Sequence, residues 1–213
     1  MSPRIHPSLG GTLLELLVTL AVSGILLIVG VPSFEAMLAR QRLVSTANDL
    51  LGEIHLARLE AIRLGRRVTL CRLPSSEARQ CAHPNSTTGW DQGWMLFVDP
   101  QPQTPPLREA EGAVLRLQGT TPQGLNILGR SSSATSLFVS YTMDGMSRLM
   151  NGGFLAGRLR VCSTSRALGD DERARDIVIN AVGRAVIACP RGVPSSCPAP
   201  PSGTVIQPSE VCW

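Results

Sequence analysis

The stretch that decides the fold is SLGGTLLELLVTLAVSGILLIVGVPSF, residues 8–34. Within it, Thr12–Val31 is a run of 20 residues that carries a single charged side chain, Glu15. An α-helix of that length spans ~30 Å, which matches the hydrocarbon core of a bilayer. The sequence therefore predicts a membrane-spanning helix. A carboxylate inside such a span is rare and usually functional.

The apolar run is expected to stay on the mature protein. A secretory signal peptide ends in a small-residue cleavage site behind its apolar region. Here Val31 is followed by Pro32 and by a further helical pattern. The pair of small residues, Gly10 and Gly11, stands before the run instead. Processing is therefore expected on the N-terminal side of the helix.

A second helical pattern follows Pro32, where a kink is expected. Apolar residues recur there at spacings of four and three, which predicts one buried stripe: Leu43, Ala47, Leu50, Ile54, Ala57, Ala61 and Leu64. Gly65 is typical of a helix C-terminus. A continuous helix from Thr12 to Leu64 would be ~80 Å long. That is too long for a compact fold of this size, so part of it must pack against something else.

From Arg66 onward the pattern changes to short apolar runs separated by turn residues. Eight strands are expected: Arg67–Leu73, Trp94–Val98, Ala113–Leu117, Leu125–Leu128, Leu137–Thr142, Arg158–Cys162, Asp176–Asn180 and Ala185–Cys189. No strand is followed by a ten-residue helical pattern, which favours an antiparallel sheet.

The predicted fold class is α+β, a long N-terminal helix packed on an antiparallel β-sheet domain. Its expected parts are a leader 1–10, a transmembrane half-helix 11–32, an amphipathic half-helix 33–65, a β-rich domain 66–189 and a Pro- and Cys-rich tail 190–213.

Composition and motifs point away from catalysis. The net charge is +4, and all 20 basic residues are arginine, which fits either a coding bias or phosphate recognition. The sequence contains no G-x-S-x-G, H-E-x-x-H or P-loop motif. Its three histidines, His6, His55 and His83, lie in separate segments. We therefore expect no enzyme activity, no cofactor and no metal site.

The residues from Gly10 to Glu15 resemble the processing site of type IV prepilins and type II secretion pseudopilins. The resemblance implies cleavage between Gly10 and Gly11 by a prepilin peptidase and methylation of the new N-terminus, although Gly11 stands where Phe or Met is usual. Glu15 would then be the fifth mature residue and would meet the N-terminal amine of a neighbouring subunit. Two such charges offset each other's desolvation only when they pair closely. Alternatively, Glu15 is an acid at a helix start, where the helix dipole favours it.

Two later stretches resemble the GspH/FimT family: GWDQGWMLFVD, residues 89–99, and RDIVINAVGRAVIAC, residues 175–189. The resemblance implies a non-catalytic minor pilin or pseudopilin of a type IV pilus or a type II secretion pseudopilus. Its expected place is the bacterial inner membrane, crossed once, with the domain in the periplasm. Its expected partners are other pilins or pseudopilins, the prepilin peptidase, the inner-membrane assembly platform and the lipid bilayer. A plain membrane anchor without an assembly role is the weaker alternative.

Some members similar to FimT bind incoming DNA in natural transformation through a Gly-Arg-x-Arg motif. Here the turn at Gly183 and Arg184 lacks the second arginine, while Arg158 and Arg160 complete a literal match one strand earlier. Arg158 and Arg160 share a strand face, which Arg184 would join if the strands pair. A receptor for double-stranded DNA is therefore the alternative function. Ordinary arginines on an exposed sheet are the competing interpretation.

All six cysteines follow the apolar segment, as expected of an exported domain. Six cysteines allow 15 pairings. We expect local closures Cys71–Cys81 and Cys197–Cys212, with Cys162–Cys189 across neighbouring strands. A zinc site is the rival interpretation, but C-x-x-C spacing is absent. Without a disulfide the tail would be disordered.

Overall fold

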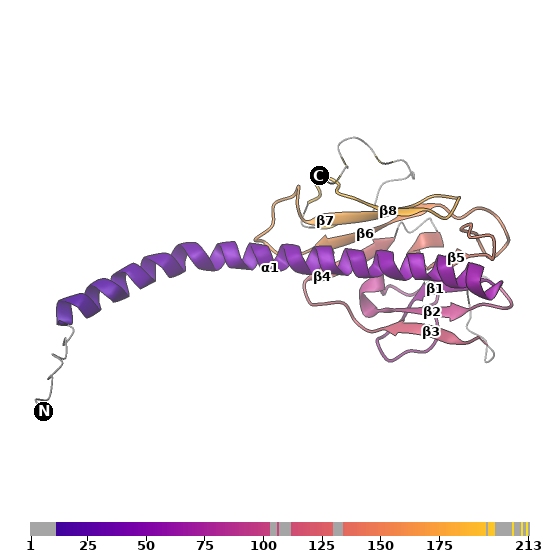
Figure 1. Cartoon of the computed structure of the whole chain (residues 1–213), viewed down its shortest axis with the longest axis horizontal. Helices are drawn as coiled ribbons and strands as arrows, with labels where there is room; N and C mark the ends of the chain where they lie inside the picture. Colours follow the sequence, from indigo (N-terminus) through magenta and orange to yellow (C-terminus); the bar gives the residue numbers. More distant parts are fainter. Residues whose placement is uncertain are drawn as a thin grey trace, which may run out of the picture.

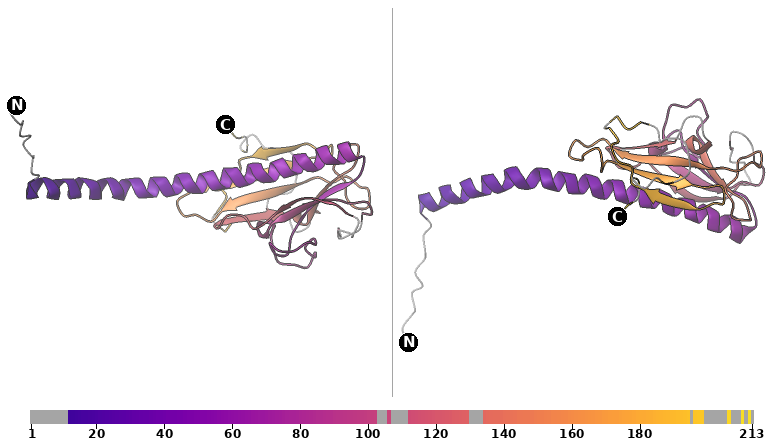
Figure 2. Two further views of the ribbon diagram at one scale, coloured as in Figure 1. Left: turned by 60° about the horizontal axis from the view of Figure 1, so that its bottom comes forward. Right: turned by 90° about the horizontal axis from the view of Figure 1, so that it is seen from above.

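The computed structural model describes residues 12–102, 106, 112–129, 134–194, 196–198, 206, 210 and 212. It consists of one long helix and a β-rich domain (Figure 1). The helix, α1, is Leu13–Leu64, and its 52 residues correspond to ~78 Å. Its first half projects away from the domain and its second half lies along it, in all views (Figure 2).

Both ends of α1 are capped, and the C-terminal cap is the one that the sequence predicts. Thr12 is the N-cap, and its side-chain oxygen accepts a hydrogen bond from the backbone N–H of Glu15. Gly65 ends the helix in the left-handed conformation at φ 62°, which a residue without Cβ adopts at no steric cost. Between the caps α1 is continuous through residue 32 and curves smoothly (Figure 2).

Eight strands follow the helix: β1 Val68–Arg72, β2 Trp94–Val98, β3 Val114–Gln118, β4 Leu125–Gly129, β5 Phe138–Tyr141, β6 Gly157–Ser163, β7 Ala174–Ile179 and β8 Ala185–Ala188. They correspond one to one to the eight expected strands. The boundaries of β2 are the expected ones, and those of the other strands differ by at most two residues.

The strands form two four-stranded sheets, where the sequence led us to expect one. The first has the order β3-β2-β1-β5 and the second the order β4-β6-β7-β8, and every strand pair in both sheets is antiparallel. The second half of α1 contacts strands of both sheets. The buried stripe of α1 therefore packs against both sheets.

The core lies between α1 and the sheets. Six of the seven residues of the predicted stripe, Leu43 to Ala61, have no exposed surface, and Leu64 is half-buried. Trp90 and Trp94 are buried as expected, and the indole N–H of Trp90 donates to the carbonyl of Thr135. The predicted α+β architecture, a long helix packed on antiparallel β-structure, is confirmed.

Candidate functional site

The free half of α1 is the first candidate functional region. Its apolar side chains point into solvent on all sides, with exposed fractions from 51% at Val22 to 77% at Leu13. An 18-residue window of this helix has a mean hydropathy of 2.5, and none of it is buried within the molecule. Length and composition thus make α1 a candidate membrane span. A helix that is apolar all round needs lipid or other helices around it.

Glu15 lies in the first turn of this helix, close to the N-terminal positive end of the dipole. Within the residues that the structure describes, its carboxylate has no ion-pair partner. Gly10 and Gly11 lie outside the described residues. The cleavage site and the pairing of Glu15 with a neighbouring amine therefore stay predictions.

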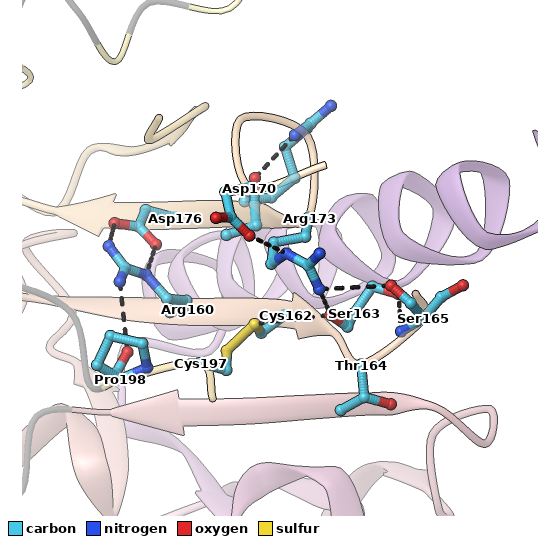
Figure 3. Close-up of a disulfide and its surroundings, with 12 residues drawn as sticks. Arg160, Cys162, Ser163, Thr164, Ser165, Asp170, Arg173, Asp176, Cys197 and Pro198 are labelled. Atoms are coloured by element: carbon cyan, nitrogen blue, oxygen red, sulfur yellow. Dashed lines mark hydrogen bonds and ion pairs between the residues drawn. A yellow bond between two sulfur atoms is a disulfide. The ribbon is translucent and has the colours of Figure 1, made fainter. Parts of the chain in front are cut away.

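The second candidate region is the face of β6 that carries Arg158 and Arg160. Both side chains are buried, at 3% and 5% exposure, together with Asp176, which is fully buried on β7. Arg160 binds Asp176 through two hydrogen bonds of 2.7 and 2.9 Å, and Arg158 binds it at 3.2 Å. Figure 3 shows Arg160 extended between Asp176 and the carbonyl of Pro198, to which it also donates.

The C-terminal tail covers this face. Three side chains at every second position of β6 reach the tail: Arg158 binds the Glu210 carboxylate at 2.7 Å, Arg160 the Pro198 carbonyl, and Cys162 forms a disulfide with Cys197. In addition, the backbone N–H of Cys189 donates to the carbonyl of Glu210. The tail thereby supplies a carboxylate to an otherwise positive cluster.

The expectation that Arg158 and Arg160 lie on an exposed sheet is therefore wrong. Their charges are neutralised by carboxylates that the sequence places 16 and 52 residues away. Arg184 is exposed at the β7–β8 turn, where its backbone N–H donates to the side chain of Asn180. Of the three arginines proposed for DNA, only Arg184 is available to a phosphate. The register of β6 and β7 sets Arg160 opposite Asp176, and this cross-strand placement is what brings the two charges together.

The disulfide predictions are correct in one case of three. Cys71–Cys81 is confirmed, with the Cα atoms 5.6 Å apart. The predicted Cys197–Cys212 and Cys162–Cys189 pairs are wrong, because the structure joins Cys162 to Cys197 and Cys189 to Cys212. The physical reason is that the tail folds back over β6 and β8, so each tail cysteine meets a strand cysteine. No cysteine is free, which leaves no thiolate for zinc.

Arg173, which binds several groups of the β6–β7 loop, was not predicted from the sequence. Arg173 is buried and donates to the carbonyls of Ser163, Ser165 and Leu168 as well as to Asp170, as Figure 3 shows for three of these partners. The loop is also tied to α1 by the Arg40–Glu172 ion pair.

Burial shapes the electrostatics beside this loop. Desolvation lowers the pKa of Arg175, and the neighbouring positive charge of Arg40 lowers it further. One ion pair of this region, Arg40–Glu172, joins α1 to the loop near the point where α1 leaves the domain.

A groove of about 280 Å³ lies at the same junction. Its lining includes Glu35, Leu38 and Arg42 of α1 and Gln123, Thr164 and Ser165 of the domain. The lining brings the hydroxyl groups of Thr164 and Ser165 together with the charged side chains of Glu35 and Arg42.

The chain is similar to one protein family in sequence and to a solved minor pilin in structure. A family model described as Type II transport protein GspH matches residues 46–183, about two thirds of the chain. Two crystal forms of the type IV minor pilin FimU from Pseudomonas aeruginosa PAO1 are similar in structure. The first is 21% identical, covers 76% of this chain and 96% of that chain, and has a TM-score of 0.47. The second is 20% identical, covers 74% and 97%, and has a TM-score of 0.44. No curated protein matches the chain in sequence.

Proposed function

The chain belongs to the GspH family, and from that premise we propose that it is a non-catalytic minor pilin or pseudopilin. In this proposal a prepilin peptidase cuts between Gly10 and Gly11 and methylates the new N-terminus. Residues 11–32 then hold the subunit in the bacterial inner membrane, with the β-domain in the periplasm. The subunit joins other pilins or pseudopilins on an inner-membrane assembly platform, in a type IV pilus or a type II secretion pseudopilus.

One observation carries the proposal: a single continuous helix has two halves with different surroundings. The half from Leu43 to Ala61 is buried against the domain, whereas the half around Ile25 is apolar and exposed. A rigid helix of this kind can pass from a bilayer into a bundle of like helices without refolding, because all its backbone hydrogen bonds are internal. Glu15 supports a registered bundle, since a carboxylate in lipid needs a close positive partner.

The test starts with the N-terminus of the natural protein. Mass spectrometry should find the mature chain starting at Gly11, and the Glu15→Ala variant should insert but fail to enter fibres. Glu35→Ala is the matched control, because Glu35 is a second exposed glutamate on α1 beyond the apolar run, and it should assemble normally. An intact Met1 or Ser2 start, together with normal assembly of Glu15→Ala, would refute the proposal.

The alternative, a receptor for double-stranded DNA, has less support. Arg158 and Arg160 are held by Asp176 and Glu210, so Arg184 is the member of the trio that is exposed. The alternative requires that the full-length protein bind duplex DNA with an affinity that falls steeply with salt. It also requires that Arg184→Ala weaken that binding. Unchanged binding of this variant, or no binding at low salt, would remove the alternative.

A further inference from the structure

Exposed apolar side chains beyond the free half-helix gather at one end of the domain. Past residue 38, seven large apolar side chains of the described residues are at least 37% exposed: Leu59, Ile62, Val114, Leu117, Met143, Phe154 and Val182. Two of them belong to the edge strand β3. The other five lie where α1 ends, where β5 and β7 end and where β6 begins, at the end of the domain opposite the free half-helix (Figure 1). We call this the distal end.

The backbone beneath these side chains is fixed by close contacts among three segments. Gly145 lies so near α1 that a Cβ added to it would be 2.9 Å from Cδ1 of Ile62 and 3.3 Å from Nε of Arg58. Arg58 donates to the carbonyl of Gly183 at 3.3 Å. Gly183, at φ 81°, leaves no room for a Cβ against the carbonyl oxygen of Gly145. The last turns of α1 and the turns that carry Met143 and Val182 therefore form one rigid surface.

The described residues of the distal end also carry an excess of positive charge. Among the described residues it carries six arginines: Arg58, Arg63, Arg66, Arg67, Arg148 and Arg184. Three carboxylates, Glu60, Asp99 and Asp144, stand against them, and Asp99 is buried. The guanidinium groups of Arg66 and Arg184 are exposed and make no hydrogen bond or ion pair within the part of the chain that the structure describes.

The place and charge of this surface restrict what can cover it. Ile62 lies 31 helical residues beyond Val31, which is ~46 Å along α1, so the bilayer that holds the free half-helix cannot reach it. A symmetric contact with the distal end of a second copy would oppose like charges. Nucleic acid would satisfy the arginines but would leave the apolar side chains without a partner.

We propose that the distal end is a docking surface for an acidic protein partner, whose apolar side chains cover Leu59, Ile62, Met143 and Val182 and whose carboxylates meet Arg66 and Arg184. A central apolar contact with a charged rim is the usual anatomy of a protein–protein interface. The rim charges would steer the partner and set its orientation. The docking surface rests on the proposed function in one respect, namely that the free half of α1 lies in the membrane.

The test is site-specific photo-crosslinking of the full-length chain in its own cells. Benzoyl-phenylalanine replaces Leu59 or Met143 in turn, and Asn48, exposed on the same helix nearer the membrane, is the control position. We expect one protein adduct common to Leu59 and Met143 and absent at Asn48. Mapping of the adduct by mass spectrometry should place the cross-linked site in a segment that contains Asp or Glu and an apolar residue.

Charge reversal then tests the rim. Arg66→Glu combined with Arg184→Glu should lower the adduct yield by about tenfold, because like charges across an interface oppose association. Arg191→Glu makes the same kind of change at an exposed arginine away from the distal end and should leave the yield unchanged. The inference is wrong if Leu59 gives no more adduct than Asn48. It is also wrong if the adduct is nucleic acid or a second copy of this chain, or if reversal has no effect.

A second probe separates this inference from the proposed function. Benzoyl-phenylalanine at Ile25 reports helix–helix contacts in an assembly. Adducts at Ile25 without adducts at Leu59 would overturn the docking surface and leave the pilin function standing. Adducts at Leu59 in a chain that keeps its first ten residues would support the docking surface and count against the pilin function.

Discussion

Replacing Asp176 by asparagine should destabilise the domain strongly. Asp176 is fully buried and neutralises two buried guanidinium groups, at 2.7 and 2.9 Å from Arg160 and 3.2 Å from Arg158. Asparagine keeps the shape but removes the charge, so Arg160 would lose its carboxylate partner and Arg158 would keep Glu210. Removing one partner of a buried ion pair costs ~3–5 kcal/mol. Glu210→Gln should cost less, ~1–3 kcal/mol, because Arg158 keeps Asp176.

The assay is guanidinium unfolding of the full-length protein in detergent with its disulfides intact, followed by tryptophan fluorescence, since Trp90 and Trp94 are buried. Asp49→Asn is the matched control, because Asp49 is exposed on α1; we expect a change within ~0.5 kcal/mol. A second control combines Asp176→Asn with Arg160→Met, which removes both charges and should recover much of the loss. A cost for Asp176→Asn no larger than that for Asp49→Asn would refute the reasoning.

Three further predictions concern the tail, a buried phenol and a turn. Replacing Cys189 and Cys212 together by serine should lower the free energy of unfolding by ~2–4 kcal/mol and make the tail sensitive to protease; an unchanged cleavage pattern would contradict this. The hydroxyl of Tyr141 is buried without a hydrogen-bond partner among the described residues, and burial raises its pKa. The folded state thus holds this proton more tightly, so the free energy of unfolding should fall as pH rises above ~10. In Tyr141→Phe this fall should be smaller. At pH 7 the variant should be as stable as the wild type or more stable, by up to ~1 kcal/mol. A hydrogen bond from the Thr142 hydroxyl lowers the pKa of Asp144, so Asp144→Asn should lose stability at pH 6. This loss should shrink as the pH falls below the unfolded pKa of ~3.9 and vanish only below the lower folded pKa; equal unfolding midpoints at pH 6 would contradict this.

The long helix and the strands could be predicted because their signals are local. The buried stripe from Leu43 to Ala61 follows from the helical period, and Gly65 marks the helix end through its left-handed backbone. Each strand is a short apolar run bounded by turn residues. Such features depend on neighbours within a few positions, and the same is true of the Cys71–Cys81 loop, whose ends are 10 residues apart.

The candidate DNA site could not be judged from the strand pattern alone. Alternation correctly placed Arg158 and Arg160 on one face, but it does not say what covers that face. Cys162 lies on the same face, and its bond to Cys197 brings the tail across the arginines. A Cys162–Cys197 disulfide places the tail on the face of β6 that carries both arginines, so this pairing, and not the strand pattern, predicts that the tail covers them.

By itself, the sequence determined that this protein has a membrane-length apolar helix with Glu15 in its first turns, continued by an amphipathic half and an antiparallel β-domain. Periodicity, caps and turn residues act over a few positions, so they can be read along the chain. Only the tertiary structure decided that the strands divide into two sheets, that the tail folds back through Cys197 and Cys212, and that Arg158 pairs with Asp176 and Glu210. These contacts join residues up to 73 positions apart, as in the pairing of Val68 with Tyr141 (141 − 68). Their partners are selected by burial and charge in three dimensions.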